Sequence, residues 1–234
     1  MLRLPLPETI PSSIEVWQLK LNLRLPISST DFSLLSKDER ARALYFYRHE
    51  DRVRAIATRA ALRRLLAERL ASPADEIGFV ANKYGKPFLR HEEGIEFNVS
   101  HAGTFSLIAI STDGPIGVDI ECRNRGVEEK MFDHYVLSSM ERSSGSGIAN
   151  FVEHWVAKES VLKALGLGIS EYLQAVSILP GEGSDYRVIH DQPEWAGLKV
   201  WPIDAPEGYA AAVAVKRPNK GIGTLRERSF TLLE

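Results

Sequence analysis

The chain has 234 residues, of which 44% are hydrophobic and 26% charged, and its formal net charge is -2 at pH 7. This length allows one large domain or two small ones, and the near balance of charge gives no global sign of a nucleic-acid or membrane-surface binder. The single cysteine, Cys122, excludes an internal disulfide framework and a thiolate-rich metal site.

The N-terminal residues MLRLPLPETIPSS contain prolines and an acid where a signal peptide needs a continuous apolar segment. No later run approaches the roughly 20 apolar residues that span a bilayer. One cysteine also suits a reducing compartment. The sequence therefore predicts a cytoplasmic protein.

The first elements are a strand and a helical region. Alternating residues over 14–23 predict a half-buried strand. Ser36 followed by Glu39 resembles a capping box, and apolar residues at helical spacing predict a long helix over 51–70.

Extended segments follow this helix. Residues 77–89 are expected to form a strand, a turn and an extended piece, because Gly85 supplies the turn and Pro87 forbids a helix. Residues 95–111 predict two strands around a loop of small residues, and IGVDIE (116–121) predicts another strand.

The later part of the chain begins with a second helical zone over 132–143. A Ser/Gly-rich stretch (142–150) leads to a strong helix over 151–165, which Gly166 and Gly168 stop. After alternating strands and turns, YAAAVAV (209–215) predicts a last strand, followed by a polar tail expected to lie on the surface.

The order of these elements repeats, at offsets of 102, 99 and 105 residues. The matching pairs are LSKDER (35–40) with LSSMER (137–142), RAALRRLL (59–66) with KESVLKAL (158–165), and GTFSLIAIS (103–111) with GYAAAVAVK (208–216). We interpret the pattern as two related α+β halves, 1–113 and 114–234, that pack face to face around a cleft. Chance recurrence of helix and strand patterns is the alternative.

Two acids interrupt the apolar strand IGVDIE. Asp119 and Glu121 share one face, because side chains alternate along a strand, while Val118 and Ile120 point the other way. Two like charges at this spacing favour a cation between them, and Mg²⁺ is a common solution. The alternative is an edge strand that shows acids to solvent.

The helix over 151–165 adds further charges. Glu159 and Lys163 are four residues apart and so share a face, with Lys158 and Trp155 near its edge. A surface ion pair is the alternative reading. Together with the strand acids, however, these side chains supply what a diphosphate with Mg²⁺ needs: carboxylates for the ion and lysines for the phosphate oxygens.

Other polar residues are less specific. Ser100 and His101 precede a Gly-containing loop where backbone amides approach a phosphate or a base closely, but no triad partner supports a serine hydrolase. Lys86 is fixed by a turn and a proline, and Arg59 lies with two further arginines on the first long helix. Each of these cations is either a ligand-binding group or solvated surface charge.

Four motifs occur in a fixed order: GKP (85–87), FNVSH (97–101), GVDIE (117–121) and WVAKESVLK (155–163). This order resembles the 4′-phosphopantetheinyl transferases of the larger, surfactin-synthetase-activating type, over roughly residues 35–216. The resemblance implies a pseudodimer of two α+β halves with the active site in the cleft between them.

The resemblance also implies the reaction: transfer of 4′-phosphopantetheine from coenzyme A to a serine hydroxyl of an apo acyl or peptidyl carrier protein, with Mg²⁺ and release of adenosine 3′,5′-bisphosphate. The roles that it implies are Mg²⁺ binding by Asp119, Glu121 and Glu159, phosphoryl contact by Lys163 supported by Lys158, 3′-phosphate contact by His101 and Arg59, and the adenosine side of the pocket for Lys86, Pro87 and Ser100. Glu159, directly or through a bound water, is the candidate general base, with Asp119 and Lys163 as the other catalytic residues.

The carrier protein is expected to meet an apolar surface between Val136 and Phe151, although this stretch also reads as a plain exposed linker. We expect a monomer that contacts neither nucleic acid nor a membrane. Two rival functions are a noncatalytic coenzyme A- or nucleotide-binding module and a Mg²⁺-dependent phosphoesterase or nuclease. Loss of one of the three carboxylates would favour the binding module, but all three are present. A nuclease needs a track of basic residues for the nucleic acid, and the net charge of -2 gives no sign of one.

Overall fold

The computed structural model describes residues 1–91, 94–124, 135–144, 151–168, 172–181 and 185–217. In the first half the strands and helices follow the predicted order. They are β1 (Leu2–Arg3), β2 (Ile14–Lys20), α1 (Ser29–Leu34), α2 (Lys37–Tyr45), α3 (His49–Leu70), β3 (Phe79–Ala81), β4 (Pro87–Leu89), β5 (Glu96–Ala102) and β6 (Phe105–Ser111).

In the second half, the strand predicted over 116–121 and the helix predicted over 151–165 are both present. The elements are β7 (Ile116–Cys122), α5 (Ser139–Ser144), α7 (Phe151–Leu165), η1 (Leu173–Ala175), β8 (Ser177–Pro180), β9 (Tyr186–Ile189), η2 (Pro193–Trp195), β10 (Leu198–Pro202) and β11 (Tyr209–Lys216). The beginning of the second helical zone, most of the Ser/Gly-rich stretch and the polar tail lie outside the described residues.

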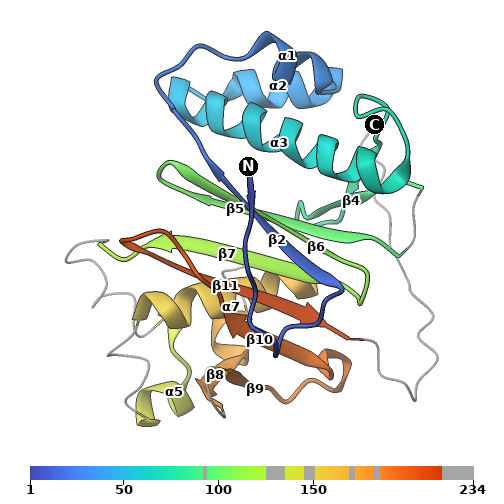
Figure 1. Cartoon of the computed structure of the whole chain (residues 1–234). Helices are drawn as coiled ribbons and strands as arrows, with labels where there is room; N and C mark the ends of the chain where they lie inside the picture. The colour runs from blue at the N-terminus through green and yellow to red at the C-terminus, as the bar shows by residue number, and fades with distance from the viewer. Residues whose placement is uncertain (92–93, 125–134, 145–150, 169–171, 182–184, 218–234) are drawn as a thin grey trace.

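The strands form two larger sheets and a hairpin. One sheet has the order β1-β2-β6-β5 and the other β7-β11-β10-β9-β8, while β3 pairs with β4. Figure 1 shows α3 over the first sheet and α7 against the second, with the two sheets between the helices. The layers therefore run helix, sheet, sheet, helix, which is the expected arrangement of two α+β halves.

Three apolar clusters fill the spaces between these layers. α3 packs on the first sheet through Leu62 and Leu66 against Ile108 and Ile110. The next strand positions face the other way, since Leu107 and Ala109 belong to the core between the two sheets. α7 covers the outer face of the second sheet. Alternation along the strands thus supplies a core on both faces of each sheet.

Strand β7 divides its side chains as predicted. Ile116, Val118 and Ile120 belong to the core between the sheets, whereas Asp119 and Glu121 line a pocket with residues of α7. The two acids therefore face helix α7 of the second half, because residues two apart on a strand share a face.

The predicted repeat has a physical counterpart in the two capping glutamates. Glu39 accepts from the backbone N–H of Ser36 at 2.9 Å, and Glu141 accepts from that of Ser138 at 2.7 Å. Each then pairs with a cation of the long helix in its own half: Arg63 in α3 and Lys158 in α7. The same device thus anchors a short helix to a long one twice in the chain. The exact division at 113/114 stays a prediction.

The described helices include none with the length and apolar character needed to cross a bilayer.

Candidate active site

The two sheets meet where β5 lies beside β7, and polar side chains of β5 make the join. Asn98 Oδ1 accepts from the N–H of Val118 at 3.0 Å, and Ser100 Oγ from that of Ile120 at 3.4 Å. The FNVSH motif of the first half therefore lies directly against the GVDIE motif of the second half. This contact brings together two motifs that strand β6 and the connection after it separate in the sequence.

A pocket of about 230 Å³ opens at this junction. We call it the acidic pocket, because three carboxylates line it. Its lining residues are Val99, Ser100, His101, Asp119, Ile120, Glu121, Trp155, Glu159 and Lys163. Strand β5, strand β7 and helix α7 each contribute, so the structure brings the predicted metal ligands together with Ser100, His101 and Lys163.

Lys163 is the central cation of the acidic pocket. Its Nζ lies 2.6 Å from Asp119 Oδ1 and 3.8 Å from Glu159 Oε2, and it donates to Ser100 Oγ at 3.2 Å. Ser100 in turn donates to Asp119 Oδ1 at 2.6 Å. Asp119 and Glu159 are only 5% and 4% exposed, so the lysine charge compensates carboxylates that have lost much of their water.

The donor set of the acidic pocket suits a hard divalent cation. Carboxylate oxygens are the ligands that Mg²⁺ prefers, and the three lining carboxylates outnumber the single lining lysine by two charges. In the part of the chain that the structure describes, however, no three His, Cys, Asp or Glu side chains approach closely enough to hold a metal ion. Metal binding at these carboxylates would thus require their side chains to move, and Lys163 to turn away from Asp119.

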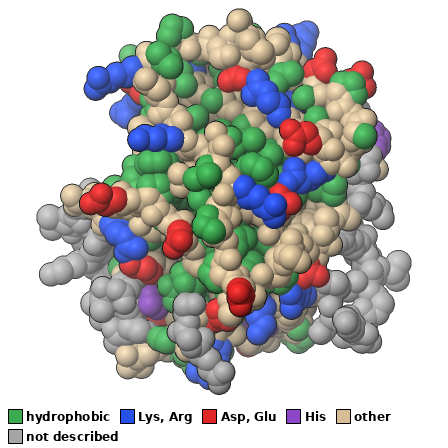
Figure 2. Space-filling model, viewed as in Figure 1, with side chains coloured by type: hydrophobic (Ala, Val, Ile, Leu, Met, Phe, Trp, Pro, Cys, Tyr) green, Lys and Arg blue, Asp and Glu red, His purple; other side chains and the backbone are tan. Residues whose placement is uncertain are grey.

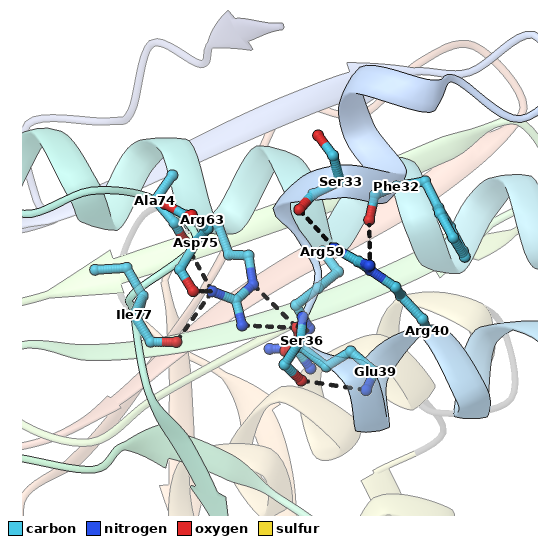
Figure 3. Close-up of polar contacts among 10 residues, drawn as sticks. All are labelled: Phe32, Ser33, Ser36, Glu39, Arg40, Arg59, Arg63, Ala74, Asp75 and Ile77. Atoms are coloured by element: carbon cyan, nitrogen blue, oxygen red, sulfur yellow. Dashed lines mark hydrogen bonds and ion pairs between the residues drawn. The ribbon is translucent and has the colours of Figure 1, made fainter.

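A second pocket of about 290 Å³ lies in the first half. We call it the arginine pocket; its lining residues are Leu35, Glu39, Arg42, Ala43, Phe46, Ala55, Thr58, Arg59, Leu62, Pro87, Val99 and His101. Figure 3 shows Glu39 beside Ser36, Arg59 and Arg63. Arg59 Nε lies 3.4 Å from Glu39 Oε1, and burial lowers the pKa of Arg59 while the Glu39 charge opposes this shift.

Arg59 keeps one hydrogen-bonding group unused. Its Nη1 atom is buried and has no hydrogen-bond partner among the described residues. A buried donor without a partner is costly. The lining of the arginine pocket also holds Arg42, so its two arginines exceed its one carboxylate and suit an anionic group such as a phosphate.

The two pockets share Val99 and His101 in their linings, so they adjoin one another. Burial and then the positive charge of Arg54 lower the pKa of His101 from its usual value. The neutral imidazole is therefore favoured near pH 7, and an anion beside it would reverse part of that preference.

Lys158 does not lie in either pocket, which corrects its predicted role beside the phosphate. Its side chain is completely buried and pairs with Glu141, and burial lowers its pKa while Glu141 opposes the shift. Glu141 also accepts from the N–H of Ile178 at 2.7 Å. Adjacent positions on a helix point in different directions, so Lys158 faces the core while Glu159 faces the pocket.

Replacing Lys158 with methionine should lower the free energy of unfolding by about 3 kcal/mol, because Glu141 is left as an unpaired buried charge. Chemical denaturation measures this change. Adding Glu141→Gln to Lys158→Met removes that charge and should restore part of the stability. If the single variant keeps its stability but binds coenzyme A more weakly, Lys158 contacts the phosphate site after all, and the structural role described here is wrong.

The prediction that Lys86 lines the adenosine side of the ligand pocket stays a prediction. The two pocket linings include its neighbour Pro87 but not Lys86. Its Nζ instead donates to the carbonyl oxygens of Ile116 and Ala164, at 3.0 and 3.3 Å. The turn and the proline do fix this lysine, as the sequence indicated, but they direct it toward the second half.

The surface predicted to meet the carrier protein is only partly described. Val136 and Phe151, its two ends, are buried in the core of the second half, so neither is an exposed apolar anchor. Residues 145–150 lie outside the described part. Among the residues that the structure describes here, Tyr135 and Met140 are large hydrophobic side chains that are exposed, at 74% and 45%.

Sequence reasoning missed Arg42 and Phe46, which line the arginine pocket from α2 and its C-terminal end. Arg42 follows Glu39 by three residues, so the capping glutamate, together with the helical spacing of three, is a signal that could have placed it on the same side. Figure 2 shows acidic and basic side chains interspersed over the viewed face, without a basic track across it.

Comparisons with known proteins agree with these features. Residues 28–113 match the family model "4′-phosphopantetheinyl transferase, N-terminal", and residues 115–214 match that of the 4′-phosphopantetheinyl transferase superfamily.

Three curated relatives bear the same enzyme name. The 4′-phosphopantetheinyl transferase HetI of Nostoc sp. is 30% identical over 82% of this chain and 85% of its own length. The transferase ffp of Bacillus subtilis is 29% identical over 88% and 94%, and Sfp of Bacillus subtilis is 26% identical over 80% and 84%.

Proposed function

Because this chain belongs to the 4′-phosphopantetheinyl transferase superfamily, we propose that it transfers 4′-phosphopantetheine from coenzyme A to a serine of an apo acyl or peptidyl carrier protein. The observation that carries the proposal is the pair of adjoining pockets: a carboxylate-lined one beside an arginine-lined one. Coenzyme A carries a diphosphate, which would bind with Mg²⁺ in the acidic pocket, and a 3′-phosphate, which would bind in the arginine pocket.

The residues around the acidic pocket have separate roles. Asp119, Glu121 and Glu159 would hold Mg²⁺, which when bound neutralises charge on the diphosphate oxygens. Lys163 contacts the transferred phosphoryl group, once its ammonium turns from Asp119 toward the substrate. A cation placed where negative charge develops lowers the barrier to phosphoryl transfer.

Glu159 is the proposed general base. The carrier serine Oγ forms a bond to the pantetheine-side phosphorus, its proton passes to Glu159, and the bond to adenosine 3′,5′-bisphosphate breaks. Asp119 is less suited to this role, because its Oδ1 already accepts from both Ser100 and Lys163.

The arginine pocket is proposed to bind the nucleotide end of coenzyme A. Arg59 and His101 contact the 3′-phosphate, supported by their shared place in the lining of this pocket. Pro87 lines this pocket and Ser100 the adjoining one, consistent with places near the adenosine.

Intact-mass spectrometry tests the function directly. Incubation with coenzyme A, Mg²⁺ and an apo carrier protein should add one phosphopantetheine group to the carrier, and a carrier with its acceptor serine changed to alanine should gain nothing. If several unrelated apo carriers keep their mass, the transferase proposal is wrong. A phosphoesterase would instead degrade coenzyme A without modifying the carrier.

Three finer points remain proposals. A cytoplasmic location is supported by the single cysteine. A monomer is supported by the acidic pocket, to which both halves of one chain contribute; a dimer in analytical ultracentrifugation would contradict it. Which carrier protein is modified is decided by assaying carriers from different pathways.

A further inference from the structure

The hairpin formed by β3 and β4 reaches from the first half to the C-terminal end of α7. Lys86 Nζ donates to the carbonyl oxygen of Ala164 at 3.3 Å, and Asn82 Nδ2 donates to that of Gly166 at 2.8 Å. The last carbonyl groups of a helix have no partners within it. Side chains of the first half therefore cap a helix of the second half.

The turn of this hairpin fixes both donors. Asn82 Oδ1 accepts from the backbone N–H groups of Tyr84 and Lys86, at 2.9 and 3.0 Å. Gly85 has a φ of 82°, which favours glycine. The turn thus holds itself together and presents Asn82 and Lys86 on the side of α7.

Lys86 joins the two elements that carry the acidic pocket. Ile116, which accepts from Lys86 at 3.0 Å, begins the strand that carries Asp119. Ala164, which accepts from the same ammonium group, directly follows Lys163. A shift of α7 along β7 would change the distances among Asp119, Glu159 and Lys163, and the bonds from Lys86 oppose that shift.

We propose that Lys86 is a positioning residue for phosphoryl transfer: it holds α7 and β7 in the register that the acidic pocket needs. This inference rests on the proposed function. Its neighbour Pro87 lines the arginine pocket, so one hairpin contacts the proposed nucleotide site and the helix that carries the catalytic groups.

The partial burial of Lys86 supports a specific role. Burial lowers its pKa to about 8, with Glu96 opposing the shift. A methionine of similar size would remove the unfavourable burial of a charge and leave two carbonyl oxygens without this donor. Because these effects on stability oppose each other, Lys86→Met is expected to fold.

Two measurements on the full chain test the proposal: transfer kinetics and hydrogen exchange. Lys86→Met should lower kcat at least about 10-fold and leave the KM for coenzyme A within about threefold, because a positioning group acts on the reacting geometry. Amide exchange should accelerate over residues 160–168. Lys86→Arg retains charged donors and should recover part of kcat.

Lys83→Met is the matched control, since Lys83 lies in the same turn and is exposed; it should leave kcat, KM and exchange unchanged. A 10-fold rise in KM for coenzyme A with unchanged kcat would show that Lys86 binds the substrate and overturn the proposal. Unchanged exchange over 160–168 would also overturn it. The exchange comparison is independent of turnover, so an inactive wild type would refute the proposed function without deciding whether Lys86 holds α7.

Discussion

Replacing Glu159 with glutamine should lower kcat about 1000-fold at saturating Mg²⁺, while the affinity for coenzyme A stays within about threefold. Glutamine keeps the shape of the side chain and one oxygen for a metal ion, but it cannot take up the proton of the attacking serine hydroxyl. Single-turnover kinetics with an apo carrier protein, together with calorimetric titration of coenzyme A, separates the chemical step from binding.

Glu121→Gln is the matched control for this variant. Glu121 lines the same pocket, and the substitution removes the same charge, but the residue has no proposed part in proton transfer. We therefore expect it to raise the Mg²⁺ concentration needed for activity and to recover most of kcat when Mg²⁺ is saturating. If Glu159→Gln binds coenzyme A and Mg²⁺ normally and retains full turnover, another group must be the base.

Replacing Gly117 with alanine should lower the free energy of unfolding by about 3 kcal/mol or more. A Cβ atom at this position would overlap the carbonyl oxygen of Ser160 and lie 2.5 Å from the amide nitrogen of Ala164. Both groups belong to the backbone of α7, so no rotation of a side chain relieves the overlap. Any folded variant must displace α7 from β7, and its kcat should fall with its stability.

Gly168→Ala provides a comparison for the Gly117 variant. A Cβ atom there would lie 3.3 Å from the ring of Tyr84, an exposed side chain that can move aside. Denaturation midpoints compare the stability of the two variants, and kcat is measured on the folded fraction of each; Gly117→Ala should be the less stable. Equal stability of both variants would mean that α7 tolerates displacement, contrary to the close packing that we describe.

The packing at Gly117 also explains why the motif GVDIE begins with a glycine. The sequence alone explained the spacing of the two acids, because residues two apart lie on one face of a strand. The glycine that precedes them lies on that same face, opposite α7. Its missing side chain lets the helix come close enough for Lys163 to reach Asp119 at 2.6 Å.

The sequence by itself determined the elements and much of the acidic pocket. Local patterns were sufficient for α7, for β7 and for the capping box of Ser36 and Glu39, because helical spacing, strand alternation and caps depend on neighbours in the chain. The internal repeat and the motif order indicated two α+β halves of the transferase type, and Asp119, Glu121 and Glu159 do line one pocket.

Only the tertiary structure decided what the other cations contact. Lys158 and Lys86 carry the same charge as Lys163 and also occur in the family motifs, but Lys158 pairs with Glu141 in the core and Lys86 caps α7. A motif does not specify which partner a long side chain meets, because that depends on segments distant in the chain. Partners such as Glu141, the carbonyl of Ala164 and the carboxylate of Asp119 are brought within reach only when the helices pack on their sheets.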